Sequence, residues 1–181
     1  MLRLRPAVPS DVPTILAFIH ELALYEREPD AVLATEADLL RDGFGPTPRF
    51  TCVIAEIDEA GDSSQSTSNQ QPTTGNLLAT PVGFALYFTS YSTWRGHHGI
   101  RLEDLYVTPS RRGQGIGKAL LAHLARIAVD QGCPRLEWDV LAWNTPAIAV
   151  YEKVGAHILT EWRIMRLSGD ALTNLAATAK D

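Results

Sequence analysis

The chain has 181 residues, of which 45% are hydrophobic and 20% charged, a composition typical of one globular domain with a sizeable core. Its formal net charge of -5 disfavours a protein that grips nucleic-acid backbone and suits a cationic substrate better. No apolar run is long enough to cross a membrane, and the N-terminal residues lack a signal-peptide pattern, so we expect a soluble, cytoplasmic protein.

The first fifty residues predict one strand and two helices. Residues 2–5 alternate between leucine and arginine, the period of a half-buried strand. Ser10 is positioned to cap a helix with one apolar face. Thr35 with Asp38 resembles a capping box, which opens a short helix that Gly43 can end.

Two further strands are predicted over residues 50–57 and 82–89, on either side of a polar segment. Residues 58–80 are rich in Ser, Thr, Gln, Asn and Gly and contain little that could be buried, so we expect them to be disordered. A linker between domains is the rival interpretation. The stretch before it is too short for a separate core, so we interpret the whole chain, residues 1–181, as one domain with an expanded loop.

In the second half, strands and helices continue to alternate. A strand over residues 100–107 leads into a glycine-rich turn and then into a helix that Gly132 ends. Three more strands and a helix follow by the same criteria. The strands lie at 136–140, 156–160 and 162–167, and the helix begins with Thr145 as its cap and Pro146 at its first position, and ends at Gly155. The pattern predicts an α/β protein with a mixed sheet.

The glycine-rich turn is the strongest functional signal. Gly113, Gly115 and Gly117 have no side chains to keep a ligand from the backbone, and they open a helix that begins near Ile116. The positive end of the helix dipole therefore lies where the turn could hold a diphosphate. Neither the ATP-binding Walker spacing nor the dinucleotide fingerprint fits, and a purely structural turn remains an alternative.

The cysteines and the paired histidines indicate no metal site. Cys52 and Cys133 lie far apart without metal-ligand or redox spacing, so we interpret both as reduced, buried apolar residues. Cys133 also has no suitable histidine nearby in sequence, which disfavours an acyl-cysteine intermediate. His97 and His98 are adjacent, a poor arrangement for two ligands of one ion, and we interpret them as loop residues.

Several ordered motifs resemble those of the GNAT superfamily of acyltransferases, and within it the spermidine/spermine and thialysine acetyltransferase branch. The motifs are Glu-Leu-Ala-Leu-Tyr-Glu at 21–26, Asp-Leu-Leu-Arg-Asp-Gly-Phe-Gly at 38–45, Gly-Phe-Ala-Leu-Tyr-Phe at 83–88, Leu-Glu-Asp at 102–104, Arg-x-x-Gly-x-Gly at 112–117 and Trp-Asn-Thr-Pro-Ala-Ile-Ala-Val-Tyr-Glu-Lys-Val-Gly-Ala at 143–156. The resemblance implies the GNAT fold, a mixed central sheet of about seven strands flanked by about four helices, with a splayed central strand pair.

There are two departures from the branch. Tyr91-Ser92-Thr93-Trp94 stands where the polyamine enzymes have a segment like Tyr-Asp-Pro-Trp, so one carboxylate that would hold a polyamine is missing and the segment is similar to the thialysine branch. The insertion at 58–80 lies away from the matched motifs.

By this resemblance the co-substrate is acetyl-CoA, and the residue spacing already described predicts no metal. The residues that the resemblance implies for its binding are Leu105, Tyr106, Val107, Arg111, Arg112, Gly113, Gln114, Gly115, Ile116, Gly117, Lys118, Asn144, Thr145, Pro146, Ala147 and Tyr151. A backbone N–H between residues 105 and 107 would also stabilise the negative charge on the reacting carbonyl oxygen. The alternatives are an ordinary paired strand at 105–107 and a helix-capping role for Asn144.

Two residues are implied as catalysts. A lysine-like ammonium, with a pKa of about 10.4, must lose a proton before it can attack. The resemblance makes Glu103 the general base, acting through a water, and we expect burial to raise its pKa. Its alternative is a surface carboxylate paired with Arg101 or Arg95. The resemblance makes Tyr151 the acid that protonates the departing thiolate, and its alternative is a core tyrosine.

The amine would lie among carboxylates and aromatic rings, which together suit an ammonium group. The residues implied by resemblance are Tyr25, Glu26, Trp94, Glu103, Asp104, Glu137, Trp138 and Asp139. Trp94 and Trp138 could instead be core or interface residues.

Together these observations predict an acetyl-CoA-dependent N-acetyltransferase that acetylates a primary amine of a small cation, thialysine-like, lysine-like or a polyamine, by direct transfer. As in similar proteins, we expect a homodimer. Two alternatives stay open at this point: acetylation of lysine in a protein or histone tail, and a non-catalytic coenzyme A-binding module.

Overall fold

The computed structural model describes residues 1–58 and 79–180, and the fold divides into two units, Met1–Leu141 and Ala142–Asp181. The predicted insertion lies almost entirely outside the described residues. Its predicted edges do not hold, because Asp58, Ala79 and Thr80 belong to strands.

The first unit is built on one mixed sheet of five strands in the order β1-β2-β3-β4-β5. The strands are β1 (Leu2–Pro6), β2 (Thr51–Asp58), β3 (Ala79–Ser92), β4 (His97–Val107) and β5 (Leu136–Glu137). The first four pair antiparallel, and β5 pairs parallel with β4. The prediction of an α/β protein with a mixed sheet is therefore confirmed.

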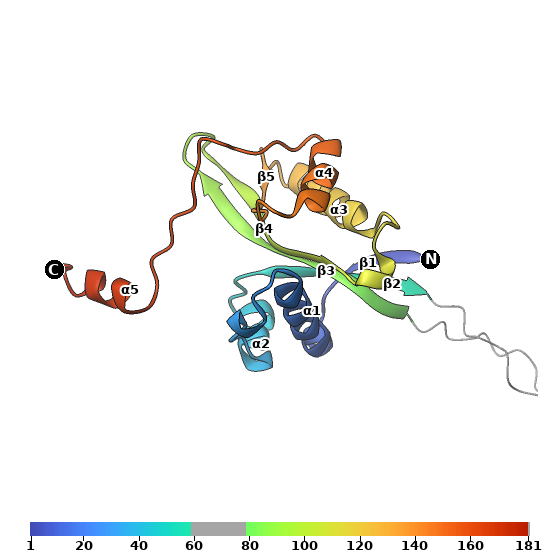
Figure 1. Cartoon of the computed structure of the whole chain (residues 1–181), viewed down its shortest axis with the longest axis horizontal. Coiled ribbons are helices and arrows are strands. Elements are labelled where there is room, and N and C mark those ends of the chain that lie inside the picture. The colour runs from blue at the N-terminus through green and yellow to red at the C-terminus, as the bar shows by residue number, and fades with distance from the viewer. Residues whose placement is uncertain (59–78, 181) are drawn as a thin grey trace, which may run out of the picture. The chain divides into compact units, whose positions relative to one another are not determined.

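Helices cover both faces of this sheet. Helix α1 (Val12–Tyr25) and helix α2 (Glu36–Phe44) lie on one face, and α3 (Ile116–Asp130) lies on the other, as Figure 1 shows. Short 3-10 turns at Pro9–Asp11, Pro29–Ala31 and Pro109–Arg111 precede α1, α2 and α3. The alternating side chains of β2 and β3 supply a buried residue to each face in turn.

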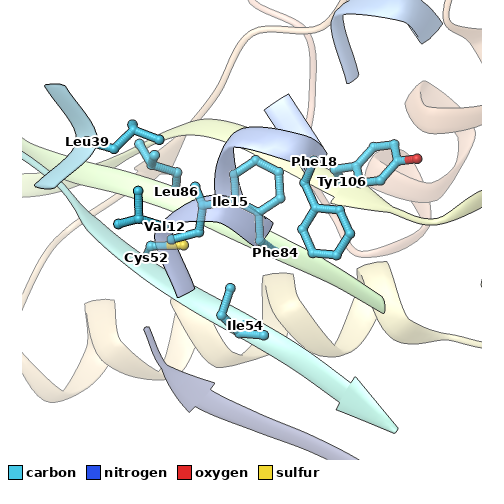
Figure 2. Close-up of a cluster of buried hydrophobic side chains, with 9 residues drawn as sticks. All are labelled: Val12, Ile15, Phe18, Leu39, Cys52, Ile54, Phe84, Leu86 and Tyr106. Atoms are coloured by element: carbon cyan, nitrogen blue, oxygen red, sulfur yellow. The ribbon is translucent and has the colours of Figure 1, made fainter. Parts of the chain in front are cut away.

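The core under α1 and α2 is drawn in Figure 2. Its buried members are Val12, Ile15, Phe18, Leu39, Cys52, Ile54, Phe84, Leu86 and Tyr106. Phe18 stacks on Phe84 with ring centroids 5.8 Å apart and lies 5.6 Å from the ring of Tyr106. Burial raises the pKa of the Cys52 thiol to about 12, in agreement with its interpretation as an inert apolar residue.

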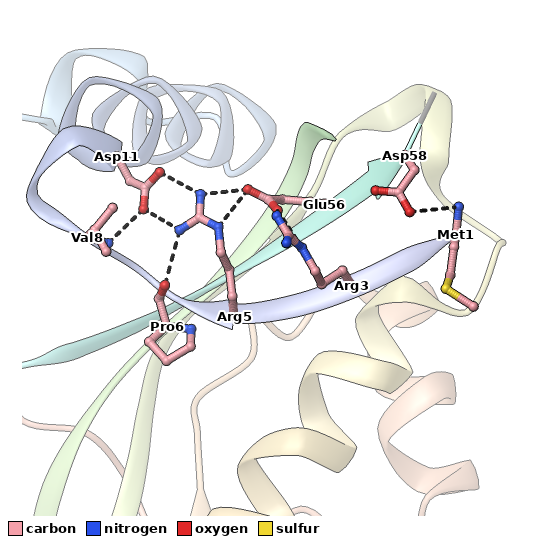
Figure 3. A network of polar contacts seen from close by, with 8 residues as sticks. All are labelled: Met1, Arg3, Arg5, Pro6, Val8, Asp11, Glu56 and Asp58. Atoms are coloured by element: carbon pink, nitrogen blue, oxygen red, sulfur yellow. Dashed lines mark hydrogen bonds and ion pairs between the residues drawn. The ribbon is translucent and has the colours of Figure 1, made fainter. Parts of the chain in front are cut away.

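A network of charged side chains joins β1, β2 and the entry to α1 (Figure 3). The Arg5 guanidinium donates to both oxygens of Asp11, at 2.6 and 2.8 Å, and to Glu56 at 2.7 Å, and Arg3 also donates to Glu56. The Arg5 hydrogen bonds hold the pKa of Asp11 below its ordinary value. At Glu56, burial raises the pKa, but the hydrogen bonds and charges of Arg5 and Arg3 lower it by more, so the pKa lies below its ordinary value.

Two predicted helix ends are wrong, each for a local reason. Ser10 does not cap α1, because it lies inside the 3-10 turn, where the Asp11 carboxylate accepts the N–H of Val8. Gly43 does not end α2. It lies inside the helix, where a Cβ would come within 2.5 Å of the Phe50 ring, so the glycine serves close packing. The capping box of α2 is confirmed.

The second unit contains α4 (Thr145–Lys153) and α5 (Gly169–Ala176). The N-cap of α4 is Asn144, whose side chain accepts the N–H of Ala147, and not Thr145 as predicted. The strands predicted at 156–160 and 162–167 are also wrong, because these described residues belong to no ladder and a strand exists only through its partner. The sheet accordingly has five strands where about seven were predicted.

Candidate active site

One extra residue in β4 determines which way the carboxylates of this strand face. Asp104 pairs with Leu86 and Leu102 pairs with Tyr87, so Glu103 is a bulge with no partner of its own in the β3–β4 register. The bulge interrupts the alternation. Tyr106 therefore lies in the core under α1, whereas Leu102, four residues earlier, is buried outside that cluster.

Three carboxylates come together beyond the bulge, one of them from the end of α1. Burial, and then the negative charges of Glu103 and Glu26, raise the pKa of Asp104 to about 6. Burial also raises the pKa of Glu26, which follows the last residue of α1. The arrangement is a partly desolvated, negatively charged site of the kind that suits an ammonium group.

Glu103 itself is exposed, so the burial that we expected around it falls on its neighbour Asp104 instead. Arg101, one of the two partners in the structural alternative for Glu103, pairs with Asp139. Glu103 projects from the bulge, and Asp104 carries the perturbed pKa. The raised pKa that we expected at Glu103 therefore belongs to its neighbour Asp104, and Glu103 has the exposed position.

The ladder between β4 and β5 ends early, which leaves the end of β4 open on one side. It consists of the pairs Ile100–Leu136 and Arg101–Glu137. The Thr108 N–H donates to the Val82 carbonyl of β3, so by alternation the peptide groups of Leu105 and Val107 point away from β3, past the end of β5. This is the predicted splayed strand pair, and β5 is shorter than the strand predicted at 136–140.

The glycine-rich turn between β4 and α3 has the conformation that a diphosphate cradle requires. Gly113 and Gly115 have φ angles of +76° and +82°, and Gly115 is the N-cap of α3. A Cβ at either residue would meet no heavy atom within 4 Å, so the space in front of the turn is open. Buried Ile116 anchors the turn, while Gln114 and Lys118 are exposed. These features fit a bound diphosphate.

Arg112 lies between the turn and the end of α1. Its guanidinium carbon is 4.6 Å from the centroid of the Tyr25 ring and 5.6 Å from that of Tyr106. Its Nε donates to the Val107 carbonyl at 3.0 Å, and the Tyr106 hydroxyl donates to Glu21 of α1. Sequence reasoning missed Glu21, although its spacing of four residues from Tyr25 places both on one face of the helix.

The other residues predicted for the amine side are more dispersed. Trp94 lies in the turn between β3 and β4 and is 86% exposed. Glu137 pairs with Arg135 at 2.8 Å, and Trp138, which follows β5, is half-buried. His97 and His98 begin β4, with ring centroids 4.4 Å apart, and are not the loop residues that we predicted.

The remaining residues predicted to bind the cofactor belong to the second unit. Asn144 caps α4, as its structural alternative proposed, and Thr145, Pro146 and Ala147 form the first turn of that helix. Tyr151 is half-buried in the last turn of α4, where its carbonyl accepts the N–H groups of residues 154 and 156.

In the described part of the chain, no group of three His, Cys, Asp or Glu side chains is arranged to hold a metal ion. Among the same residues, no helix combines the length and apolar character that a membrane span needs.

The sequence profile of the acetyltransferase (GNAT) family matches residues 24–156. The chain is 42% identical to a thialysine N-epsilon-acetyltransferase of Bos taurus, over 96% of each chain. It is 33% identical to an L-ornithine N5-acetyltransferase of Arabidopsis thaliana, over 94% of this chain and 86% of the relative. Among solved structures, an integron cassette protein from the mobile metagenome of V. cholerae is similar, with a TM-score of 0.71, 26% identity and 98% coverage of both chains.

Proposed function

We propose, from the fact that this chain belongs to the acetyltransferase (GNAT) family, that it transfers the acetyl group of acetyl-CoA directly to a primary amine of a small cationic substrate. The chain is an acyltransferase, and acetyl-CoA is its acyl donor. The choice of a small amine is supported by relatives whose names specify thialysine and L-ornithine as acceptors. Both acceptors carry a terminal primary amine.

The observation that carries the proposal is the carboxylate cluster of Glu26, Glu103 and Asp104 beside the open end of β4. A cationic amine lowers the electrostatic cost of keeping these carboxylates together, and they in turn hold its charge. The missing carboxylate at Ser92-Thr93 favours a compact amine of the thialysine or lysine kind over a long polyamine.

The amine must be neutral when it attacks, so a base has to take its proton. We propose Glu103 as that base, acting through a water, with Asp104 as the neighbour that holds the ammonium. The pKa of about 6 at Asp104 is close to the range in which a general base is most effective. This observation favours Asp104 as the second candidate for the same role.

The rest of the reaction uses the backbone and the second unit. N–H groups of Leu105 and Val107, which point past β5, would stabilise the charge on the carbonyl oxygen as the amine adds to it. Tyr151 would protonate the thiolate when the tetrahedral intermediate collapses. Residues 111–118 would hold the diphosphate of coenzyme A. Residues 144–147, at the start of α4, would also bind coenzyme A.

We also propose that the two units form one GNAT domain, because the family profile spans residues 24–156 and so crosses the boundary at residue 141. A homodimer, expected from the resemblance, and a cytoplasmic location, expected from the sequence, are part of the same proposal. Sedimentation at micromolar concentration tests the dimer directly.

The test is thiol release from acetyl-CoA with thialysine, lysine, ornithine, spermidine and a histone peptide in parallel. We expect thialysine, lysine or ornithine to give the highest kcat/KM. Glu103→Gln should lose at least about 100-fold in turnover while its coenzyme A affinity stays unchanged. Asp130→Asn, which removes an exposed carboxylate from α3, is the matched control. A histone peptide as best acceptor, or no thiol release with any amine, would contradict the proposal.

If Asp104 is the base instead, the pH dependence of kcat/KM in the wild-type enzyme and in Glu103→Gln distinguishes the two assignments. The kcat/KM of the wild-type enzyme should rise with pH through about 6, because Asp104 is then protonated below that value. The negative charge of Glu103 contributes to the raised pKa of Asp104, so Glu103→Gln should move this limb to lower pH. Under the Glu103 assignment, Glu103→Gln lowers turnover by at least about 100-fold across this pH range.

A further inference from the structure

Arg112 is held by three groups before any ligand binds. Tyr25, at the end of α1, stacks on its guanidinium at 4.6 Å, and the ring of Tyr106 lies 5.6 Å away on β4. The Val107 carbonyl accepts a hydrogen bond from its Nε. A long arginine side chain loses much conformational freedom when it is fixed, and here the fold has fixed it in advance.

The second tyrosine is itself held in place. The Tyr106 hydroxyl donates to the Glu21 carboxylate, and the Arg112 guanidinium carbon lies 5.6 Å from the centroid of the Tyr106 ring. Burial, and then Glu21, raise the pKa of Tyr106 to about 12, so it stays a neutral donor at physiological pH. Glu21 and Tyr25 are four residues apart on α1, and both therefore reach toward the strand that carries the diphosphate turn.

A stacked guanidinium remains able to bind an anion. Aromatic rings contact its flat faces, whereas its N–H donors lie along its edges. Arg112 adjoins Gly113, where the open turn begins. Stacking on Tyr25 therefore orients the cation and leaves its edges to donate to a diphosphate.

We propose that Tyr25 is a positioning residue for the cofactor: its ring holds the Arg112 guanidinium in the orientation that binds the diphosphate of coenzyme A. This inference rests on the proposed function, and it changes the role of Tyr25. By resemblance we had placed Tyr25 among the amine-binding residues. Its stacking on Arg112 instead assigns it to the affinity for acetyl-CoA.

The experiment is a double-mutant cycle on coenzyme A affinity, measured by calorimetry in wild type, Tyr25→Leu, Arg112→Gln and the double variant. Tyr25→Leu should weaken binding about 2- to 5-fold, the range for a cation–π contact at an exposed arginine. In the Arg112→Gln background the same change should have no further effect. Tyr25→Phe, which keeps the ring, should bind like wild type. Tyr91→Leu removes an exposed tyrosine from β3 and is the matched control.

Steady-state kinetics distinguishes this positioning role from a purely structural role of Tyr25, because it compares the KM for donors with and without the diphosphate. Tyr25→Leu should raise the KM for acetyl-CoA with kcat unchanged, and its KM for acetyl-pantetheine, which lacks the diphosphate, should equal that of wild type. Independent, additive effects of the two substitutions, or an equal loss with acetyl-pantetheine, would overturn the inference. If wild-type protein binds no coenzyme A, the proposed function itself fails.

Discussion

The raised pKa of Asp104 predicts that removing its charge stabilises the fold. Its pKa moves from an ordinary 3.8 to about 6 in the folded chain. At about 1.4 kcal/mol per pKa unit, the charged form of Asp104 costs the folded state about 3 kcal/mol. Asp104→Asn removes this charge, so at pH 8 it should raise the free energy of unfolding by up to about 3 kcal/mol.

The sign and the pH dependence follow from the direction of the shift. The folded state binds the Asp104 proton more tightly than the unfolded state, so the charge destabilises the fold progressively as pH rises from 3.8 through about 6. At pH 5 the advantage of Asp104→Asn should therefore fall to about half its value at pH 8.

Urea unfolding of wild type and Asp104→Asn, at pH 5 and pH 8, measures this difference. Asp130→Asn on the exposed face of α3 serves as the control, and its effect should be small and equal at both pH values. If Asp104→Asn destabilises the fold at pH 8, or changes stability equally at both pH values, then the buried charge of Asp104 does not destabilise the fold as we infer. A confirmed result would mean that the site keeps a destabilising charge for its chemistry.

Two further substitutions test other parts of the first unit. Glu56 is 4% exposed and accepts hydrogen bonds from Arg3 and Arg5. Glu56→Gln should therefore lower the free energy of unfolding, measured in urea at pH 7, by about 2 kcal/mol. An unchanged urea midpoint would contradict a structural role for this network. Gly83→Ala would put a Cβ 2.5 Å from a carbonyl oxygen of the neighbouring strand, whereas Gly115→Ala meets no atom within 4 Å and carries only the strain of φ +82°. Gly115→Ala should lower the free energy of unfolding by about 1 kcal/mol, and Gly83→Ala should lower it by more. The reverse order would show that β3 and β4 can move apart easily to make room for the Cβ.

The features that the sequence predicted correctly have local causes. The turn before α3 was predictable because glycine spacing, the preceding apolar strand and the following helical period all lie within about thirty residues. The capping box of α2 was predictable because Thr35 and Asp38 satisfy each other within one turn. The order of strands and helices followed from the same local periodicity, and the family resemblance supplied the splayed strand pair.

The features that were missed depend on which segments meet. Nothing in residues 136–140 shows that the ladder with β4 stops after Glu137, because that is decided by the partner strand. Likewise, Leu-Glu-Asp predicts carboxylates on β4, but only the register with β3 makes Glu103 the bulge and gives Asp104 the burial. The stacking of Tyr25 on Arg112 joins residues far apart in the chain, beyond the reach of any local pattern.

The bulge at Glu103 gives β4 one residue more than the pairing with β3 requires. Ahead of it, Leu102 belongs to one layer of the fold, and after it Tyr106 belongs to the opposite layer. If Glu103 were deleted, Leu102 and Asp104 would become neighbours and could keep their partners Tyr87 and Leu86 in a regular ladder, so the side chains that follow would keep their faces and the carboxylate that projects from the bulge would be lost. The extra residue therefore adds one carboxylate next to Asp104 without altering how the rest of the strand packs.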